Sequence, residues 1–184
     1  MAFENAIRNF EIIERWGIVR LHQRGNLGAH SHRVAIYADQ IAMILGIEER
    51  ETRYEILRYA LWHDVLEIKT GDLPAPAKEF ILDRAKHDAY EADYINDFKG
   101  TDGMGGAQVE GIVKVADLLD ATLSLVIDKR MGNELLDDMY QDMSQKLLSA
   151  VSALRFGDAK CDAVRREIVN AIGRHTYMPL QPFP

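Results

Sequence analysis

One stretch of the chain, residues 62–78, combines side chains that could do chemistry with residues that end a helix. His63, Asp64 and Glu67 follow the apolar run at 56–62. Residues three and four apart share a helix face, so His63 continues the apolar stripe of Ile56 and Ala60 towards the core, and Asp64 continues that of Leu57 and Leu61. Burying a charge without a partner is costly. A bound divalent metal explains the pair most simply, and the alternative is a helix end with a solvated acidic edge.

Two further residues on other predicted helices could complete a metal site. His30 precedes Val34 by four positions, which places it on a core-facing stripe; a hydrogen-bonded core histidine is the alternative. Asp117 lies at the edge of the apolar stripe of another predicted helix. Two imidazoles and two carboxylates suit Mn, Co, Fe, Ni or Zn better than Mg or Ca. Such a metal activates water and polarises a phosphoryl oxygen, so the expected chemistry is hydrolysis.

The apolar periodicity predicts helices throughout the chain and no strand. The predicted helices span residues 3–14, about 28–45, 48–66, 78–98, 108–127, 133–155 and 159–173. The class is therefore all-α, a single helical bundle of about six to seven helices. We expect one domain over residues 1–184, with a core at about 10–130 and C-terminal helices at 133–175. A glycine-rich stretch at 99–106 lacks the ending of a phosphate-binding P-loop and is predicted to be a plain connection.

Composition narrows the class of partner and the compartment. The net charge of −7 over 184 residues argues against a general binder of nucleic-acid polymers, which would show a basic balance. Cys161 is the only cysteine, so no intramolecular disulfide can form, and a reducing cytoplasm fits. The N-terminus does not have the pattern of a signal peptide, and no apolar run is long enough to span a bilayer. We therefore expect a cytoplasmic protein that does not enter a membrane.

The order His30, His63-Asp64, Asp117 resembles the H…HD…D pattern of the HD-domain phosphohydrolases. Further motifs resemble the bacterial 5'-deoxynucleotidases of that superfamily, and the likeness extends over about residues 10–130. These motifs are Arg15-Trp16, Gly28-Ala29-His30-Ser31, Lys114-Val115-Ala116-Asp117 and the segment from Glu67 through Asp72 to Lys78. The chain is also similar to the smaller phage HD-domain dATP triphosphohydrolases, which share the Arg-Trp-x-hydrophobic motif. The sequence leaves both branches open.

The resemblance implies roles for the chemical centre. The metal ligands would be His30, His63, Asp64 and Asp117. Glu67 would handle protons beside the metal, which its spacing of one turn from the His-Asp pair also suggests. Asp72 would assist proton transfer or the leaving oxygen; its alternative role is that of a turn residue after Gly71.

The same resemblance implies four substrate contacts. Arg15 would bind a phosphate as a bidentate donor, and Lys78 would contact phosphate as well. Trp16 would pack on the sugar and disfavour a 2'-hydroxyl, while Ile18 would press on the base edge and favour adenine. The alternatives are core packing for Trp16 and Ile18 and an ordinary exposed position for Lys78. A second pair, His87-Asp88, is predicted to be a solvated surface pair.

The expected activity is hydrolysis of a small deoxynucleotide such as dAMP or dATP at its 5' phosphoester. The products would be a deoxynucleoside and phosphate or triphosphate. The resemblance also implies a homo-oligomer, at least a dimer, and a bacterial gene or a phage gene expressed in a bacterial host. Two alternatives stay open: an HD hydrolase of another phosphoester, such as an alarmone or a cyclic dinucleotide, and a nucleotide-sensing module without turnover.

Overall fold

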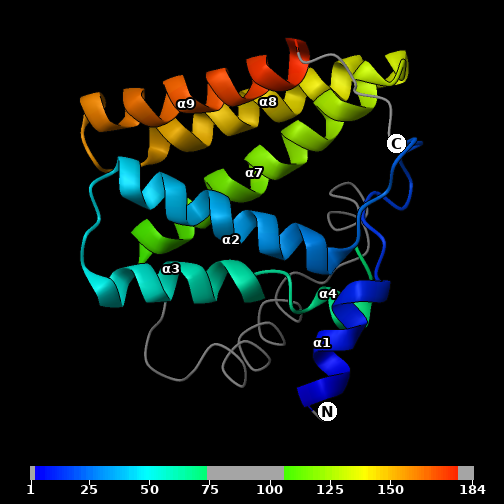
Figure 1. Cartoon of the computed structure of the whole chain (residues 1–184), viewed down its shortest axis with the longest axis horizontal. Coiled ribbons are helices and arrows are strands. Elements are labelled where there is room, and N and C mark those ends of the chain that lie inside the picture. Colours follow the sequence, from blue (N-terminus) through cyan, green and yellow to red (C-terminus); the bar gives the residue numbers. More distant parts are fainter. Residues whose placement is uncertain (1–2, 74–105, 178–184) are drawn as a thin grey trace, which may run out of the picture.

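The computed structural model describes residues 3–73 and 106–177, and this part of the chain is a bundle of helices (Figure 1). The helices are α1 (Phe3–Ile12), α2 (Leu27–Ile44), α3 (Arg50–Trp62), α4 (Glu67–Thr70), α7 (Ala107–Arg130), α8 (Asp137–Ala153) and α9 (Asp158–Tyr177), with a 3₁₀ turn η1 (Glu134–Leu136) before α8. Within these ranges the only β pairing is an isolated bridge between Glu14 and Asn26. The all-α prediction is confirmed. The predicted helix at 78–98, the pair His87-Asp88 and Lys78 lie outside the described residues.

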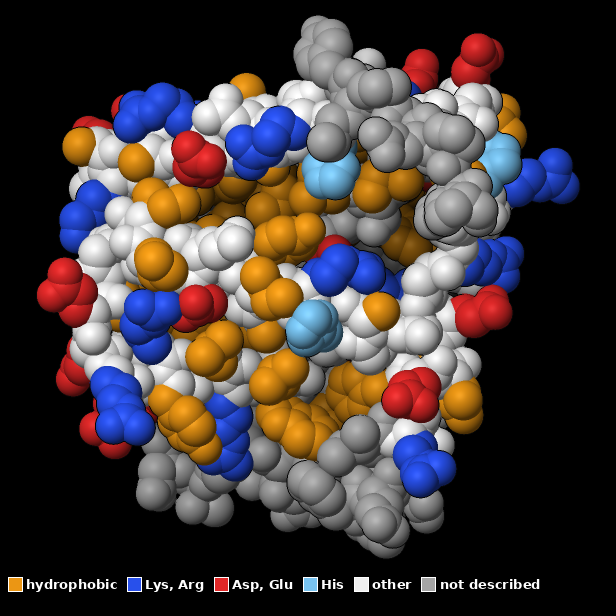
Figure 2. Space-filling model, in the orientation of Figure 1, with side chains coloured by type: hydrophobic (Ala, Val, Ile, Leu, Met, Phe, Trp, Pro, Cys, Tyr) orange, Lys and Arg blue, Asp and Glu red, His pale blue; other side chains and the backbone are white. Residues whose placement is uncertain are grey.

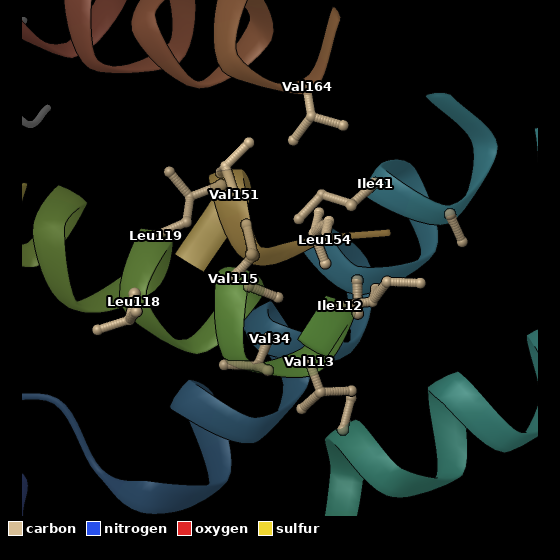
Figure 3. Close-up of a cluster of buried hydrophobic side chains, with 14 of the residues drawn as sticks. Val34, Ile41, Ile112, Val113, Val115, Leu118, Leu119, Val151, Leu154 and Val164 are labelled. Atoms are coloured by element: carbon tan, nitrogen blue, oxygen red, sulfur yellow. The ribbon is translucent and has the colours of Figure 1, made fainter. Parts of the chain in front are cut away.

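Helix α7 is the centre of the bundle. It packs against α2 and α3 on one side and against α8 and α9 on the other, and it runs diagonally between these two pairs (Figure 1). Its buried residues lie on every side of the helix, as expected for a helix enclosed by others. Figure 3 shows the result: Val34 and Ile41 of α2, Val115 of α7, Val151 of α8 and Val164 of α9 meet in one cluster.

A smaller apolar cluster joins α1 to the segment that follows α3. Phe10, Leu27 and Val65 are buried in it, and Trp62 packs against them. The rings of Phe10 and Trp62 meet edge to face, with centroids 5.9 Å apart and an interplanar angle of 87°. This cluster fixes the end of α1, and with it the loop that leads from α1 into α2.

The third predicted helix, 48–66, is too long at its C-terminus, because α3 ends at Trp62. The ring Nδ1 of His63 lies 2.7 Å from the carbonyl oxygen of Ala60. In a continuing helix that carbonyl would accept the N–H of Asp64. The chain instead makes tighter turns, with Val65 N donating to Trp62 O at 3.0 Å. His63 and Asp64 therefore lie in a turn rather than on a helix.

One predicted apolar stripe is also wrong. Leu57 and Leu61 were expected to lead Asp64 into the core, but their exposed fractions are 36% and 43%. The buried residues of α3 are Ile56 and Ala60, which precede His63 as the other predicted stripe requires.

One face of the described residues carries mixed charges. On the face drawn in Figure 2, Lys and Arg side chains are interspersed with Asp and Glu rather than gathered into one patch. In the described ranges no helix has the length and apolar character needed to cross a membrane.

Candidate metal centre and active site

Three separate elements bring together the four residues predicted to bind a metal. His30 lies in the first turn of α2, which begins at Leu27 because the Asn26 side chain accepts the N–H of Ala29 at 2.8 Å. His63 and Asp64 lie in the turn after α3, and Asp117 lies on α7. Distances of 3.2–3.5 Å separate neighbouring ligand atoms of this cluster: His30 Nε2–His63 Nε2 3.3 Å, His63 Nε2–Asp64 Oδ2 3.2 Å, His30 Nε2–Asp64 Oδ2 3.4 Å and His30 Nε2–Asp117 Oδ1 3.5 Å.

The donor chemistry of this cluster fits a bound cation. A carbonyl oxygen only accepts, so the contact with Ala60 O places the proton of neutral His63 on Nδ1. The Nδ1 of His30 lies 2.7 Å from the Asp120 carboxylate, which likewise only accepts. The two Nε2 atoms therefore present lone pairs to each other and to the Asp64 carboxylate, and that of His30 also faces Asp117. Lone pairs converging in this way need a proton or a metal ion between them, and His and Asp ligands suit a transition metal.

In the metal-free protein the cluster retains a proton. Burial alone would lower the pKa of His63, but the neighbouring Asp64 carboxylate, with Asp117, raises that pKa to about 9. Burial opposes the charge of Asp64 too, yet His63, His30 and Arg15 hold the pKa of Asp64 well below its usual range.

Metal binding should therefore release a proton at neutral pH. A metal needs the deprotonated imidazole, so its apparent affinity should rise about tenfold per pH unit between pH 6 and 8 and level off above about 9. Calorimetric titration with Co²⁺ or Mn²⁺ in buffers of different ionisation enthalpy measures the number of protons released. We expect close to one at pH 7; no release would contradict a protonated His63 in the metal-free state.

Arg15 lies directly against the cluster. Its Nη1 donates to Asp64 Oδ2 at 3.0 Å, and only 12% of its side chain is exposed. Burial lowers the pKa of Arg15, but the carboxylates of Asp64, Asp117, Glu67 and Asp72 more than compensate and raise it. A guanidinium that is permanently charged thus lies among the carboxylates, where it can bind an anionic group next to the metal ligands.

Trp16 adopts an uncommon backbone conformation, with φ of 65°. A non-glycine residue in this region costs on the order of 1–3 kcal/mol and persists only where its surroundings enforce it. The Trp16 N–H donates to Asp72 Oδ2 at 2.7 Å, and its carbonyl accepts the N–H of Val19 at 2.9 Å. Asp72 thus fixes the turn that presents Trp16. Ile18 lies in the same turn with 74% of its surface exposed, so the alternative of core packing is wrong for this residue.

Glu67 is buried at the start of α4, with 5% of its surface exposed. Its N–H donates to the Asp64 carbonyl at 2.9 Å, so a single turn links it to the metal-binding pair. Its charge is one of those that raise the pKa of Arg15. The predicted proton-transfer residue is therefore buried one turn from the metal-binding pair, and its charge acts on the predicted phosphate-binding residue.

Sequence reasoning missed Asp120, which holds His30 in place. Asp120 is buried, and its Oδ2 lies 2.7 Å from His30 Nδ1. Both of its oxygens also accept from Arg33, at 2.5 and 3.1 Å. The signal was a pair of matching intervals: Arg33 lies three residues after His30, and Asp120 lies three residues after Asp117. Residues spaced in this way face the same side of their helices.

Replacing Asp120 by asparagine should weaken metal binding by about 10- to 100-fold, because the second partner of a metal-binding histidine fixes its orientation and basicity. Competition with a chromophoric chelator measures this affinity. The matched control is Asp39→Asn, which removes a carboxylate paired with Arg53 between α2 and α3, away from the cluster. Equal affinities in the two variants would show that Asp120 only stabilises the fold.

A pocket of about 430 Å³ opens beside the cluster, between α3 and α7. His63, Asp64 and Asp117 line it together with Tyr59 and Lys114. The Lys114 ammonium lies 2.9 Å from Asp117 Oδ2 and is 60% exposed. The pocket thus provides space for a ligand beside the candidate metal ligands, with the Lys114 ammonium at its edge.

Comparison with known proteins agrees with the fold. Residues 2–83 match the family of 5'-deoxynucleotidase YfbR-like proteins. The chain is 27% identical over 144 residues to a 5'-deoxynucleotidase of Vibrio atlanticus, covering 69% of this chain and 74% of the relative. It is 29% identical over 151 residues to the Pasteurella multocida 5'-deoxynucleotidase PM0747, covering 72% and 76%.

Solved structures share the bundle. The cyanophage S-2L HD phosphohydrolase DatZ, solved with dA and one catalytic Zn²⁺ ion, superposes with a TM-score of 0.76 at 21% identity, covering 95% of this chain and 98% of DatZ. The PH0347 protein of Pyrococcus horikoshii superposes with a TM-score of 0.70, also at 21% identity.

The fold, together with the similarity to 5'-deoxynucleotidases, supports a hydrolase of the HD-domain type, and its gathered His and Asp side chains could hold a metal ion. The similarity to 5'-deoxynucleotidases supports the 5'-deoxynucleotidase branch of the HD-domain phosphohydrolases.

Proposed function

We propose that this protein hydrolyses a deoxynucleotide at its 5' phosphoester and releases the deoxynucleoside. One observation carries the proposal: the Nε2 atom of His30 lies within 3.5 Å of ligand atoms of His63, Asp64 and Asp117, and the Arg15 guanidinium lies 3.0 Å from Asp64. A cation site with an adjoining guanidinium suits a phosphate ester. The 5'-deoxynucleotidase relatives supply the substrate class.

We propose that the four clustered residues hold one divalent transition metal. Their mixed nitrogen and oxygen atoms favour Mn, Co, Fe, Ni or Zn, and the DatZ structure carries Zn²⁺. When bound, such an ion supplies positive charge to a phosphoryl oxygen and lowers the pKa of an adjacent water.

The residues of the chain would then divide the remaining work. Arg15 binds the phosphate and orients it, since its planar guanidinium can donate two parallel hydrogen bonds. Glu67 accepts the proton of the attacking water, because it is buried one turn from Asp64 and next to Arg15. Lys114, at the side of the pocket, offers a second cation to phosphate oxygens. Asp72 holds the Trp16 turn, and its part in proton transfer stays a prediction.

For the nucleoside, we propose that Trp16 packs on the sugar and Ile18 contacts the base. The turn that holds both residues leaves Ile18 exposed. This turn begins at Trp16, directly after Arg15. Adenine is the proposed base, supported by the dA found in DatZ. Lys78 is a proposed phosphate contact on the resemblance alone.

Trp16→Ala should narrow the preference for dAMP over AMP by about tenfold, because a missing ring leaves room for the 2'-hydroxyl; packing contacts of this size contribute roughly 1–3 kcal/mol to discrimination. The ratio of kcat/KM for dAMP and AMP measures the effect. Trp16→Phe, which keeps an aromatic face, should retain most of the preference. An unchanged ratio in Trp16→Ala would remove Trp16 from the sugar site.

Product analysis tests the function itself. Metal-free protein resupplied with Co²⁺ or Mn²⁺ is incubated with dAMP, dATP, dGTP and ATP, and the products are separated by chromatography. Deoxyadenosine and phosphate from dAMP would establish a 5'-deoxynucleotidase. Deoxyadenosine and triphosphate from dATP, with dGTP and ATP spared, would establish a triphosphohydrolase. No product from any substrate, with metal bound, would overturn the proposal.

A further inference from the structure

The residues proposed to contact the nucleoside lie in a loop that is closed at its base. This loop, residues 15–25, leaves the end of α1 and returns to the start of α2. Arg15 N donates to Gly25 O and Leu27 N donates to Ile13 O, each at 2.9 Å. These backbone bonds fix the two ends of the 15–25 loop side by side, but they do not determine where its outer part lies.

Asp128 of α7 holds the outer part of the loop. Its Oδ1 accepts two consecutive backbone N–H groups, from His22 at 2.7 Å and from Gln23 at 3.2 Å. Its Oδ2 lies 3.3 Å from Nδ1 of His22. Asp128 is only 2% exposed. A buried carboxylate that accepts backbone N–H groups constrains the path of the main chain, whichever side chains the loop carries.

Asn133 completes this contact from the turn after α7. Its Nδ2 donates to Asp128 Oδ2 at 2.6 Å and to the carbonyl of Arg20 at 2.7 Å. Asn133 is itself buried, with 7% of its surface exposed. Together, Asp128 binds the backbone N–H groups of His22 and Gln23, and Asn133 binds the backbone carbonyl of Arg20.

Trp16 and Ile18 lie between the fixed base of the loop and the part held by Asp128. The positive φ of Trp16 is a conformation that persists only when the surroundings enforce it. Asp72 acts on Trp16 directly, at 2.7 Å. The hold on residues 20–23 is a second constraint, because it prevents the chain after Val19 from relaxing away from that turn.

Asp128 also lies on the helix that carries two residues of the metal site. It follows Asp117 by eleven positions, which is about three helical turns and roughly 17 Å along the axis. Asp117 contributes to the metal cluster, and Asp120 holds His30. The same rigid helix thus sets the position of the metal cluster and of the loop.

We propose that Asp128, assisted by Asn133, is a positioning residue that holds the nucleoside-contacting loop at a fixed distance from the metal cluster. This inference rests on the proposed function, in which Trp16 and Ile18 contact the nucleoside. Asp128 acts on recognition of the substrate, while metal binding and proton transfer depend on other residues. It is therefore expected to affect KM and the choice of sugar.

The kinetic test compares Asp128→Asn with the wild type and with Asp39→Asn, a control that loses a carboxylate paired between α2 and α3. Asn133→Ala serves as a second variant that loosens the loop without altering α7. We expect KM for dAMP to rise about tenfold and the dAMP-over-AMP preference to narrow in both loop variants, with metal affinity unchanged and kcat within about threefold. Unchanged KM and preference, or loss of metal and kcat with KM unchanged, would overturn the proposal.

A fluorescence test needs no substrate and separates this inference from the proposed function. The chain has two tryptophans, so Trp62→Phe leaves Trp16 as the only reporter. Adding Asp128→Asn should increase the amplitude of fast depolarisation of Trp16 in time-resolved anisotropy, and adding Asp39→Asn should not. A Trp16 that stays equally immobile in Asp128→Asn would overturn the inference even if the protein hydrolyses deoxynucleotides. A more mobile Trp16 in a protein that hydrolyses none of them would support the positioning role of Asp128 and refute the proposed function.

Discussion

Replacing His63 by alanine is expected to abolish metal binding and to reduce turnover by about 10³-fold or more. The residue supplies one of the two imidazole nitrogens of the cluster. Loss of the metal would remove several kcal/mol of transition-state stabilisation, and each 1.36 kcal/mol corresponds to a tenfold change in rate. Helical content should change little, because His63 lies in the turn after α3 rather than in the apolar core. Metal content by elemental analysis, circular dichroism and kcat/KM for dAMP measure the three effects.

His32→Ala is the matched control for this prediction. His32 lies two residues from His30 on α2 but is exposed to solvent. Its loss should leave metal content and turnover at the wild-type level. Full activity in His63→Ala, with metal retained, would refute the assignment of the metal centre.

Replacing Glu67 by glutamine is expected to lower kcat by about 10²- to 10⁴-fold, the range for removal of a general base. The substitution keeps the size of the side chain but removes its ability to accept a proton. Metal content should stay at the wild-type value, because the four clustered ligands are untouched. Single-turnover kinetics with Co²⁺-loaded protein separates the chemical step from product release.

Glu51→Gln provides the control for that measurement, since Glu51 is an exposed residue of α3 with the same side chain. It should leave kcat unchanged. If Glu67→Gln instead lost metal in parallel with rate, Glu67 would be a ligand or a support of the cluster rather than the base.

The sequence was sufficient to predict the helices with a clear apolar period. The predicted span 108–127 corresponds to α7, and a start near residue 28 corresponds to α2. The proximity of His30, His63, Asp64 and Asp117 was also predicted, because each lay on or beside a predicted apolar stripe. For Asp64 that stripe, Leu57 and Leu61, is exposed, so its position follows from its neighbour His63 instead. Arg15 and Asp72 came from the resemblance; Arg15 contacts Asp64 of the cluster, and Asp72 accepts the N–H of Trp16.

The remaining features depend on contacts between distant residues. No proline or glycine stops α3 after Trp62; a side-chain contact with the Ala60 carbonyl does so. Leu57 and Leu61 are apolar yet largely exposed, since apolar composition does not by itself determine burial. Asp120 and Asp128 read as ordinary polar positions within an apolar helix, because the residues that they hold in place, His30, Arg33 and His22, lie 87 or more residues away in the sequence.

The spacing of Asp120 and Asp128 on α7 limits where residues can be inserted into or deleted from this helix. One residue inserted between Asp120 and Asp128 would turn everything beyond it by about 100° about the helix axis. Asp128 would then face away from the backbone groups of His22 and Gln23. A gap or insertion of a full heptad would restore the angle but shift the carboxylate by roughly 10 Å. Insertions and deletions between Asp120 and Asp128 should therefore break the contact with the 15–25 loop at positions where point substitutions leave it intact.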